Sequence, residues 1–286
     1  MDAAVAAATV LEDCPLFNAG KGAVFNIDGK HELEVSLMLS KPPSSHPEIS
    51  PTRRGFSLSL LTRVKNPAKL ARALYLSPDK VPHAFLSGSN AEALAESLGE
   101  ALVDPSYFFT EHRWREHRRG LGLPEEPLPS QKSTEGVHGP YPMGTIGAVA
   151  LDARGCIAVV TSTGGRTNKL VGRIGDTPMF GAVSGQRSGG IRMKLHERLA
   201  FQGPAMVIQA TASTIAHRIK FLGEPLTHAT EKAVESLLRD GALGGVIALD
   251  ASGNVVMPMN SPGMYRGVID EDGMAKTAIF SDDVLT

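Results

Sequence analysis

The junction Gly144-Thr145 constrains this chain most, because it joins a segment with little capacity to fold to a run with strong strand character. Residues 121–144 are rich in proline, serine, glutamate and glycine, and such a composition buries too little apolar surface to hold a fixed structure. Residues 145–152, TIGAVALD, then begin an apolar run that indicates a strand. The junction therefore divides the chain into segments 1–144 and 145–286, which we expect to share one structural domain, with 121–144 as a linker.

A threonine at this place can act as a nucleophile if the chain is cut directly before it. Its hydroxyl then lies beside its own α-amine, whose unperturbed pKa of about 7.7–8.0 leaves a large fraction as a neutral base near physiological pH. That pairing activates a hydroxyl without a histidine or a metal. The simpler interpretation is that Thr145 is a β-branched residue at a position that suits β-branched residues. The neighbouring motifs must decide between the two.

The near-equal numbers of basic and acidic residues argue against one class of partner, nucleic acid. The 286 residues include 29 Lys and Arg against 30 Asp and Glu, so the protein lacks the basic surface that phosphate binding needs, and we predict no nucleic-acid partner. The one basic run is diluted by glutamates, and we interpret it as a solvated helix face. It contains Arg113, Arg115, Arg118 and Arg119.

Cysteine usage and the N-terminus indicate the compartment. Cys14 and Cys156 are the only two cysteines, and they have no metal or redox spacing, so a reduced compartment without a disulfide framework is expected. The first residues lack the basic region of a signal peptide, and no apolar run approaches the ~18 residues of a membrane span. We therefore expect a cytoplasmic protein with no membrane partner.

Two similar hairpin patterns indicate the fold class. The runs 147–152 and 156–161 flank a turn at 153–155, and the runs 245–250 and 254–257 flank a turn at 251–253. Because these runs do not alternate strictly between apolar and polar residues, we expect two antiparallel sheets that are covered on both faces. The predicted architecture is α+β, with sheets inside and helices outside.

The predicted helices that would cover these sheets follow from caps and periodicity. Asn66-Pro67 supplies a cap and an N1 proline, Ser89-Asn90 supplies a second cap, and Thr227 a third. Helices are expected at 2–12, 68–76, 91–103, 205–221 and 227–239, and a further strand at 31–39.

Several common catalytic templates are absent from the sequence. The HExxH pattern of zinc proteases starts at His31 and at His196, but Val35 and Ala200 occupy the place of the second histidine. Residues 181–185, GAVSG, put serine one position too late for a nucleophile elbow, and there is no phosphate-binding P-loop. Zinc-protease and serine-hydrolase chemistry are therefore not predicted.

A dense polar cluster follows the junction at 161–178. If the first hairpin pairs as expected, Thr163 ends its second strand next to the start of the first, where its hydroxyl can orient a Thr145 amine. The planar guanidinium of Arg173 can donate two hydrogen bonds to a carboxylate, and the negative charge of Asp176 can pair with an ammonium. Together they suit the α-carboxylate and α-ammonium of an amino acid. The plain alternative is an internal Arg-Asp ion pair in a turn.

These motifs, in this order and spacing, resemble the plant-type L-asparaginase/isoaspartyl peptidase family of N-terminal nucleophile hydrolases. The resemblance covers 1–184 and, more weakly, the C-terminal hairpin, and residues 40–114 resemble a fungal branch. It implies a four-layer αββα sandwich, self-cleavage between Gly144 and Thr145, and αβ units that pair into a dimer of heterodimers. The motifs are LFNAGKG at 16–22, HELE at 31–34, GTIGAVALD at 144–152, TSTGG at 161–165 and NKLVGRIGDTP at 168–178.

The resemblance also implies roles for individual residues. Thr145 would be the nucleophile, Thr163 would assist its activation, and Asn18 would help hold the nucleophile and the oxyanion region. Arg173 and Asp176 would bind the α-carboxylate and α-ammonium of the substrate, within a substrate-binding set that also includes Ile174, Gly175 and Gly165. No organic cofactor is implied, but a structural sodium ion would be held by backbone carbonyls of Leu11, Glu12, Cys14, Phe17, Ala19 and Lys21.

Three departures from the family pattern concern the substrate pocket. The chain starts inside the Ala-rich first helix, so we expect a strand and a glycine loop of the family to be missing before it. After Pro178 the residues run directly into Val183-Ser184, which shortens a loop, and Gln186-Arg187 replaces a Thr-Gly pair of the oxyanion region. Loss of one oxyanion donor costs roughly 2.7 to 4 kcal/mol of transition-state stabilisation.

The leading hypothesis is an amidohydrolase in which Thr145 attacks the side-chain carbonyl of L-asparagine or of a β-aspartyl peptide. Two alternatives stay open at this point. One is a degenerate, inactive homologue that serves as a binding or interaction protein. The other is a glycosylasparaginase-like threonine hydrolase of the same fold.

Overall fold

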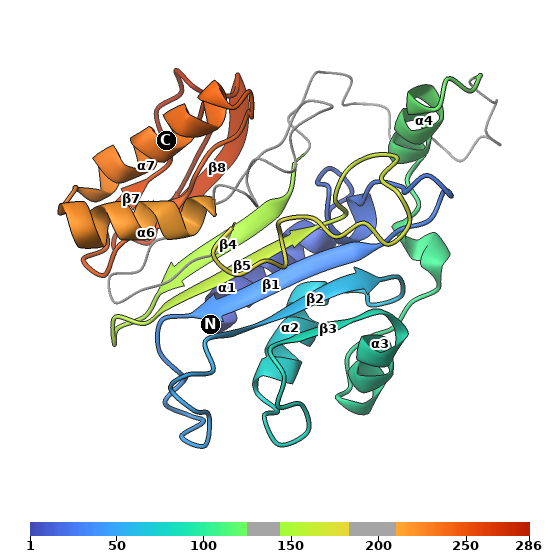
Figure 1. The fold of residues 1–286 in the computed structure, drawn as a ribbon, viewed down its shortest axis with the longest axis horizontal. Helices are drawn as coiled ribbons and strands as arrows, with labels where there is room; N and C mark the ends of the chain where they lie inside the picture. Colours follow the sequence, from blue (N-terminus) through green and yellow to red (C-terminus); the bar gives the residue numbers. More distant parts are fainter. Residues whose placement is uncertain (125–143, 183–209) are drawn as a thin grey trace.

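The computed structural model describes residues 1–124, 144–182 and 210–286, and a five-stranded mixed sheet lies at its centre (Figure 1). The strand order is β3-β2-β1-β5-β4, in which β2 and β3 pair in parallel and the other neighbours are antiparallel. Segment 1–144 contributes three strands and segment 145–286 contributes two, so the sheet joins the two segments. The strands are β1 Leu33–Leu39, β2 Gly55–Leu61, β3 Phe85–Ser87, β4 Ile146–Leu151 and β5 Ile157–Thr163.

Helices cover one face of this sheet (Figure 1). Along β1, Val35, Leu37 and Leu39 belong to the main core together with apolar residues of α1 and α2. Successive strand residues point to opposite faces, so Glu34, Ser36 and Met38 face the other way. That other face is therefore polar near the start of β1 and apolar near its end. The helices on the first face are α1 Asp2–Glu12, α2 Pro67–Tyr75 and α3 Gly88–Ser97.

The C-terminal part forms a second core of its own. Helices α6 Thr211–Leu222 and α7 Leu226–Arg239 pack on each other and on residues near β6 Ala248–Leu249. The predicted second hairpin is confirmed, because β6 pairs antiparallel with β7 Val255–Val256. Figure 1 shows these elements beside β4, together with a further hairpin of β8 Gly263–Ile269 and β9 Ala275–Phe280.

The arrangement of the sheets differs from the expectation in part. The described residues form one five-stranded mixed sheet and two two-stranded sheets, rather than two antiparallel sheets alone. The mixed sheet arises because β3 joins β2 in parallel after the crossover through α2. The architecture is therefore a mixed α/β fold around a mixed sheet. Every residue of β5 is buried, as expected for a strand that is covered on both faces.

The starts of the helices are set by contacts with residues distant in sequence as much as by local capping residues. α1 has the expected bounds, and α2 begins at the expected Pro67, but Asn66 does not cap it. The Asn66 amide instead donates to Asp13, and the first free N–H of α2, on Ala68, donates to the carboxylate of Glu12 at 3.0 Å. α7 likewise starts after Pro225 without a side-chain cap, so the capping role predicted for Thr227 was wrong.

Two other expectations for helices concern their length. α3 covers 88–97 and not 91–103. It begins after Ser87, so the cap predicted at Ser89-Asn90 was wrong, and it ends early because Gly99, two residues beyond Ser97, adopts the left-handed conformation (φ +77°). Gly241 (φ +74°) follows α7 in the same left-handed conformation. The predicted helix at 205–221 corresponds to α6, and its residues 205–209 lie outside the described ranges, as does most of the linker.

The basic run is not a uniformly solvated helix face. It lies on α4 Glu111–Gly120, and the Arg113 side chain is only 2% exposed. Arg113 Nε donates to the carbonyl of Gly22 at 2.8 Å, and Nη1 pairs with Glu116 at 2.8 Å. The interpretation was therefore wrong for Arg113, which fastens α4 to the 16–24 segment, and the pattern of charges gave no sign of this because the partner is a main-chain oxygen.

An aromatic cluster lies between α4 and the 24–31 turn. The ring of Phe25 packs on His31 at 4.1 Å, on Trp114 at 5.2 Å and on His117 at 5.5 Å between centroids. His31 Nδ1 lies 3.3 Å from the carbonyl of Val24, while its Nε2 is buried and has no hydrogen-bond partner within the described ranges. Burial lowers the pKa of His31 from 6.5 to about 4.

This shift predicts a loss of stability in mild acid. The unfolded chain binds a proton at His31 with a pKa near 6.5, and the folded chain only near 4, so stability is lost as the pH falls through this window. Between pH 7.5 and pH 5 the expected loss is about 2 kcal/mol. His31→Phe should remove this component from urea-unfolding curves recorded at the two pH values, in a Thr145→Ala background that keeps the chain intact. An unchanged pH dependence would show that His31 titrates normally in the folded protein.

Within the described ranges, none of the helices has the length and apolar character that a membrane-crossing helix requires.

Candidate active site

The hairpin register brings Thr145 and Thr163 together. Ile146 pairs with Ser162, so one step further along the ladder Thr145 lies opposite Thr163, as the sequence predicted. The Thr145 hydroxyl donates to Thr163 Oγ1 at 2.9 Å, and the N–H of Gly165 donates to the same oxygen at 3.0 Å. Thr163 is 2% exposed and Thr145 is half-buried. The Thr145 hydroxyl is thus held by a buried, fixed acceptor.

Asn18 holds the peptide bond that precedes Thr145. Its main-chain N–H donates to the carbonyl oxygen of Gly144 at 3.2 Å, and its main-chain oxygen accepts from Gly164 at 3.1 Å. Its side-chain oxygen accepts from Val24 at 3.1 Å, and its side-chain nitrogen donates to the carbonyl of Gly165 at 2.7 Å. All four polar groups of Asn18 are used, so the 16–22 motif, the Gly144-Thr145 junction and the 161–165 motif form one rigid unit.

Two glycines permit this close approach. A Cβ on Gly164 would lie 2.7 Å from the side-chain oxygen of Asn18, which leaves no room for a side chain. Gly165 has a φ of +80°, which an L side chain rarely adopts, and a Cβ there would lie 3.2 Å from Nη1 of Arg173. Gly165 therefore connects the threonine pair to the loop that carries the predicted substrate-binding residues.

The 173–176 segment presents groups of both charges near Gly165. Among the described residues no ion pair joins Arg173 to Asp176, although the Arg173 charge acts to lower the pKa of the Asp176 carboxyl. Burial raises the pKa of Asp176, while its own N–H, Arg173 and the N–H of Thr177 act in the opposite direction. Gly175 is buried between them and Ile174 is 38% exposed.

Sequence reasoning missed the residues that hold this segment in place. Glu32 and Glu34, in the HELE motif, accept the N–H groups of Gly172 and Gly175, each at 2.9 Å. Lys169 lies between the two glutamates and is buried. The available signal was the pair of carboxylates two positions apart at the start of a strand that is otherwise mostly apolar.

Helix α4 also supports this loop. Asn168, held at a φ of +57°, shares hydrogen bonds with His117 through both side-chain atoms of its amide. Thr167 Oγ1 donates to Glu116 at 3.0 Å. Because α4 precedes Gly144 and the loop follows it, these contacts hold the two segments together across the junction.

The loop proposed for sodium folds back on itself. The carbonyls of Leu11 and Ala19 accept from Cys14 and Gly22 at 3.3 and 3.2 Å, and the Leu11 carbonyl also accepts from Asp13. A Cβ on Gly20 would lie 2.3 Å from the carbonyl oxygen of Glu12, and one on Gly22 would lie 2.1 Å from that of Phe17. The carbonyl oxygens of this loop therefore crowd around its glycines, whereas the carboxylate of Glu12 points away to α2.

Two of the three departures concern residues outside the described ranges. Val183-Ser184 and Gln186-Arg187 lie there, and the structure describes the loop after Pro178 only as far as Ala182.

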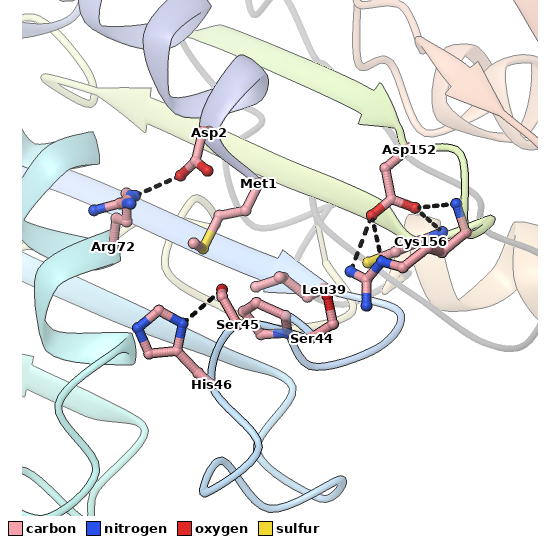
Figure 2. A pocket seen from close by; sticks show the side chains of 11 residues that line it. Met1, Asp2, Leu39, Ser44, Ser45, His46, Arg72, Asp152 and Cys156 are labelled. Atoms are coloured by element: carbon pink, nitrogen blue, oxygen red, sulfur yellow. Dashed lines mark hydrogen bonds and ion pairs between the residues drawn. The ribbon is translucent and has the colours of Figure 1, made fainter.

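A cavity of about 240 Å³ lies at the other end of the sheet (Figure 2). Its lining includes Asp2, Arg72, Asp152, Arg154 and the buried Cys156. The two guanidinium groups are already paired, Arg72 with Asp2 at 2.7 Å and Arg154 with Asp152 at 3.0 Å. This end of β5 lies about 20 Å from Thr163 along the strand. The cavity is therefore separate from the threonine pair.

Comparison with known proteins places this arrangement in a family. The model of the asparaginase family matches residues 1–279. The isoaspartyl peptidase of Salmonella typhimurium is 36% identical over 267 residues, which cover 93% of this chain and 79% of that protein. A protein of Arabidopsis thaliana named probable isoaspartyl peptidase/L-asparaginase 2 is 31% identical over 290 residues, covering 94% of this chain and 82% of its own length. The isoaspartyl peptidase/L-asparaginase of Mus musculus is 42% identical over 182 residues, or 64% of this chain and 49% of that protein.

The match runs through both segments and includes every motif from which the resemblance was inferred. The predicted family is therefore confirmed, and this chain belongs to the asparaginase family.

Proposed function

We propose that this protein is an L-asparaginase/isoaspartyl peptidase that hydrolyses L-asparagine and β-aspartyl peptides with Thr145 as its N-terminal nucleophile. The observation that supports it most is the contact of Thr145 Oγ1 with Thr163 Oγ1 at 2.9 Å, directly beside a Gly144 carbonyl that accepts the N–H of Asn18. A nucleophile, its proton acceptor and a polarised carbonyl thus meet at one peptide bond. The names of the relatives favour this function over an inactive homologue or a glycosylasparaginase.

The first reaction would be self-cleavage of the Gly144-Thr145 peptide bond. Thr145 Oγ attacks the carbonyl carbon of Gly144 while its proton leaves toward Thr163 Oγ1, and the oxygen that becomes negative is stabilised by the N–H of Asn18. The C–N bond then breaks, the Thr145 nitrogen takes up a proton, and an ester remains. Water hydrolyses that ester to give a Gly144 carboxylate and a free Thr145 amine.

Substrate hydrolysis would use the same hydroxyl with the new amine as its base. Arg173 binds the α-carboxylate of the substrate and Asp176 its α-ammonium, which points the side-chain carbonyl toward Thr145. Thr145 Oγ attacks that carbonyl, ammonia or an amino acid leaves, and water then releases aspartate from the acyl-enzyme. Asp176 must be ionised for its role, so the raised pKa of this carboxyl makes substrate binding weaken as the pH falls toward it.

The finer architecture and compartment are also proposals. We place the chain in the four-layer αββα class, assembled as a dimer of αβ units. Cys14 and Cys156 are both free in the described structure, which supports a reduced compartment such as the cytoplasm.

A structural sodium ion fits the loop that contains residues 11–21. Its donors are neutral carbonyl oxygens, a set that suits a hard monovalent cation, and the ligands would be Leu11, Glu12, Cys14, Phe17, Ala19 and Lys21. The ion would stiffen the segment that carries Asn18 and would take no part in the chemistry. We expect a higher melting temperature in sodium chloride than in choline chloride at equal ionic strength. Equal melting temperatures would contradict the site.

The function itself is tested with three substrates. Purified protein is incubated with L-asparagine, with a β-aspartyl dipeptide and with an N-glycosylated asparagine, and the release of aspartate is measured. Turnover of the first two is expected. Turnover of only the glycosylated substrate would support the glycosylasparaginase alternative, and a folded protein that turns over none of them would support the inactive homologue.

A further inference from the structure

Two carboxylates bracket the residues that are proposed to bind substrate. Glu32 accepts the N–H of Gly172 and Glu34 accepts the N–H of Gly175, each at 2.9 Å. These N–H groups lie on either side of Arg173, and Gly175 directly precedes Asp176. The main chain around both proposed substrate ligands is therefore fixed to the start of β1.

Glu34 and Lys169 form a buried pair of charges beneath this segment. The Glu34 and Lys169 side chains are 0% and 1% exposed, and Nζ of Lys169 lies 3.8 Å from Oε1 of Glu34. Nζ also donates to the main-chain oxygen of Glu32 at 2.7 Å. Burial raises the pKa of Glu34 and lowers that of Lys169, and the attraction between them opposes both shifts.

One oxygen of Glu34 is left for Arg173. Oε2 of Glu34 is buried and has no hydrogen-bond partner among the residues that the structure describes. A Cβ on Gly175 would lie 3.0 Å from this oxygen and 2.6 Å from Nη1 of Arg173, so the two groups face each other across the bare backbone of Gly175. The Glu34 carboxylate therefore attracts the Arg173 guanidinium, and the two groups are not joined by a direct ion pair within the described part of the chain.

We infer that Glu34, with Lys169 as its buried counter-ion, is a positioning residue that fixes Arg173 and Asp176 and thereby sets the affinity for the aspartyl head group. This inference rests on the proposed function, because it assigns the affinity to the proposed substrate-binding residues. Glu34 does not contact the substrate, since it is fully buried.

The same contacts indicate that the Glu34 side chain is not needed for self-cleavage. The contacts that hold Thr145 and Gly144 come from Thr163 and Asn18. Glu34 pairs with Thr163 only through the main-chain ladder, which a change of side chain leaves in place. Self-cleavage is therefore an internal control for an intact fold and an intact nucleophile.

The test is Glu34→Gln, which keeps the shape and a hydrogen-bond acceptor but removes the charge. We expect the KM for L-asparagine and the Kd for L-aspartate, measured by calorimetry, to rise about 10- to 100-fold, with kcat and the rate of self-cleavage within about threefold of wild type. The matched control is Glu92→Gln. Glu92 is also a buried carboxylate that accepts main-chain N–H groups, but it lies on α3 and binds residues 62 and 63. It should leave both constants unchanged.

Each outcome separates the inference from the function on which it rests. If wild type binds aspartate and hydrolyses asparagine but Glu34→Gln keeps its KM and Kd, only this inference is wrong. If Glu34→Gln loses self-cleavage and melting temperature along with affinity, Glu34 is structural and the positioning role is wrong. If wild type neither binds aspartate nor hydrolyses asparagine, the proposed function fails and the inference fails with it.

Discussion

Thr145→Ala is expected to leave the protein as one 286-residue chain and to reduce aspartate release from L-asparagine to background. The substitution removes the oxygen that is proposed to attack the Gly144 carbonyl, and without cleavage no α-amine is formed to serve as a base. Both reactions should therefore be lost together. Mass spectrometry of the purified protein measures the first, and a coupled assay of aspartate measures the second.

The control for this prediction is Thr145→Ser, which keeps the hydroxyl. It should still cleave and still hydrolyse asparagine, at a lower rate because the hydroxyl loses the methyl group that restricts its rotamer. Wild-type fragments should end at Gly144 and begin at Thr145. Cleavage at another bond, or aspartate release by Thr145→Ala, would place the chemistry elsewhere in the chain.

Thr163→Val is the second substitution with a large expected effect. Valine has nearly the shape of threonine, so the buried site should stay packed, but Thr145 and Gly165 both lose the oxygen to which they donate. A positioned proton acceptor contributes about 10²- to 10⁴-fold to such a step, and a loss of this size is expected in the rate of self-cleavage. The rate is followed by gel electrophoresis of freshly purified chain.

Thr163→Ser restores the oxygen without the methyl group and should recover most of the rate. The comparison distinguishes the hydroxyl from the packing. If Thr163→Val and Thr163→Ser cleave equally fast, Thr163 has no part in activating Thr145, and the base must be sought among the other groups near the junction.

The buried charges near the site matter more because they hold neighbouring groups in place than because they stabilise the folded protein. A buried ion pair such as Glu34 and Lys169 adds little net stability, because the loss of hydration offsets the attraction. It does, however, hold its partners in one geometry, and here the partners are the main-chain groups on either side of Arg173. The polar face of β1 near Glu34 therefore supports the site, while its apolar face supports the core.

The local features of the fold could be predicted because their causes are close in sequence. The Ala-rich helix α1 and the strand β1 lie where periodicity placed them, and the hairpin turn between β4 and β5 fixes the register that sets Thr145 opposite Thr163. The assignment of Arg173 and Asp176 to substrate binding rests on residue chemistry and stays a prediction.

Contacts between distant segments could not be predicted in this way. Glu12 caps α2 in place of Asn66, although 56 positions separate the carboxylate from the N–H that it binds. Arg113 binds the carbonyl of Gly22 across 91 positions, and Glu34 binds the N–H of Gly175 across 141. Main-chain partners carry no side-chain signal, so a sequence pattern does not reveal them.

The sequence by itself thus determined which residues carry the proposed chemistry: the Thr145 nucleophile at the end of the linker, its neighbour Thr163 and the charges at 173–176. It could do so because a hairpin turn and a short motif act over a few residues. Only the tertiary structure decided how these groups are held, through Asn18 at the Gly144 carbonyl and Glu34 beneath Arg173. Those contacts depend on how the two segments pack into one sheet, and packing is a property of the whole chain.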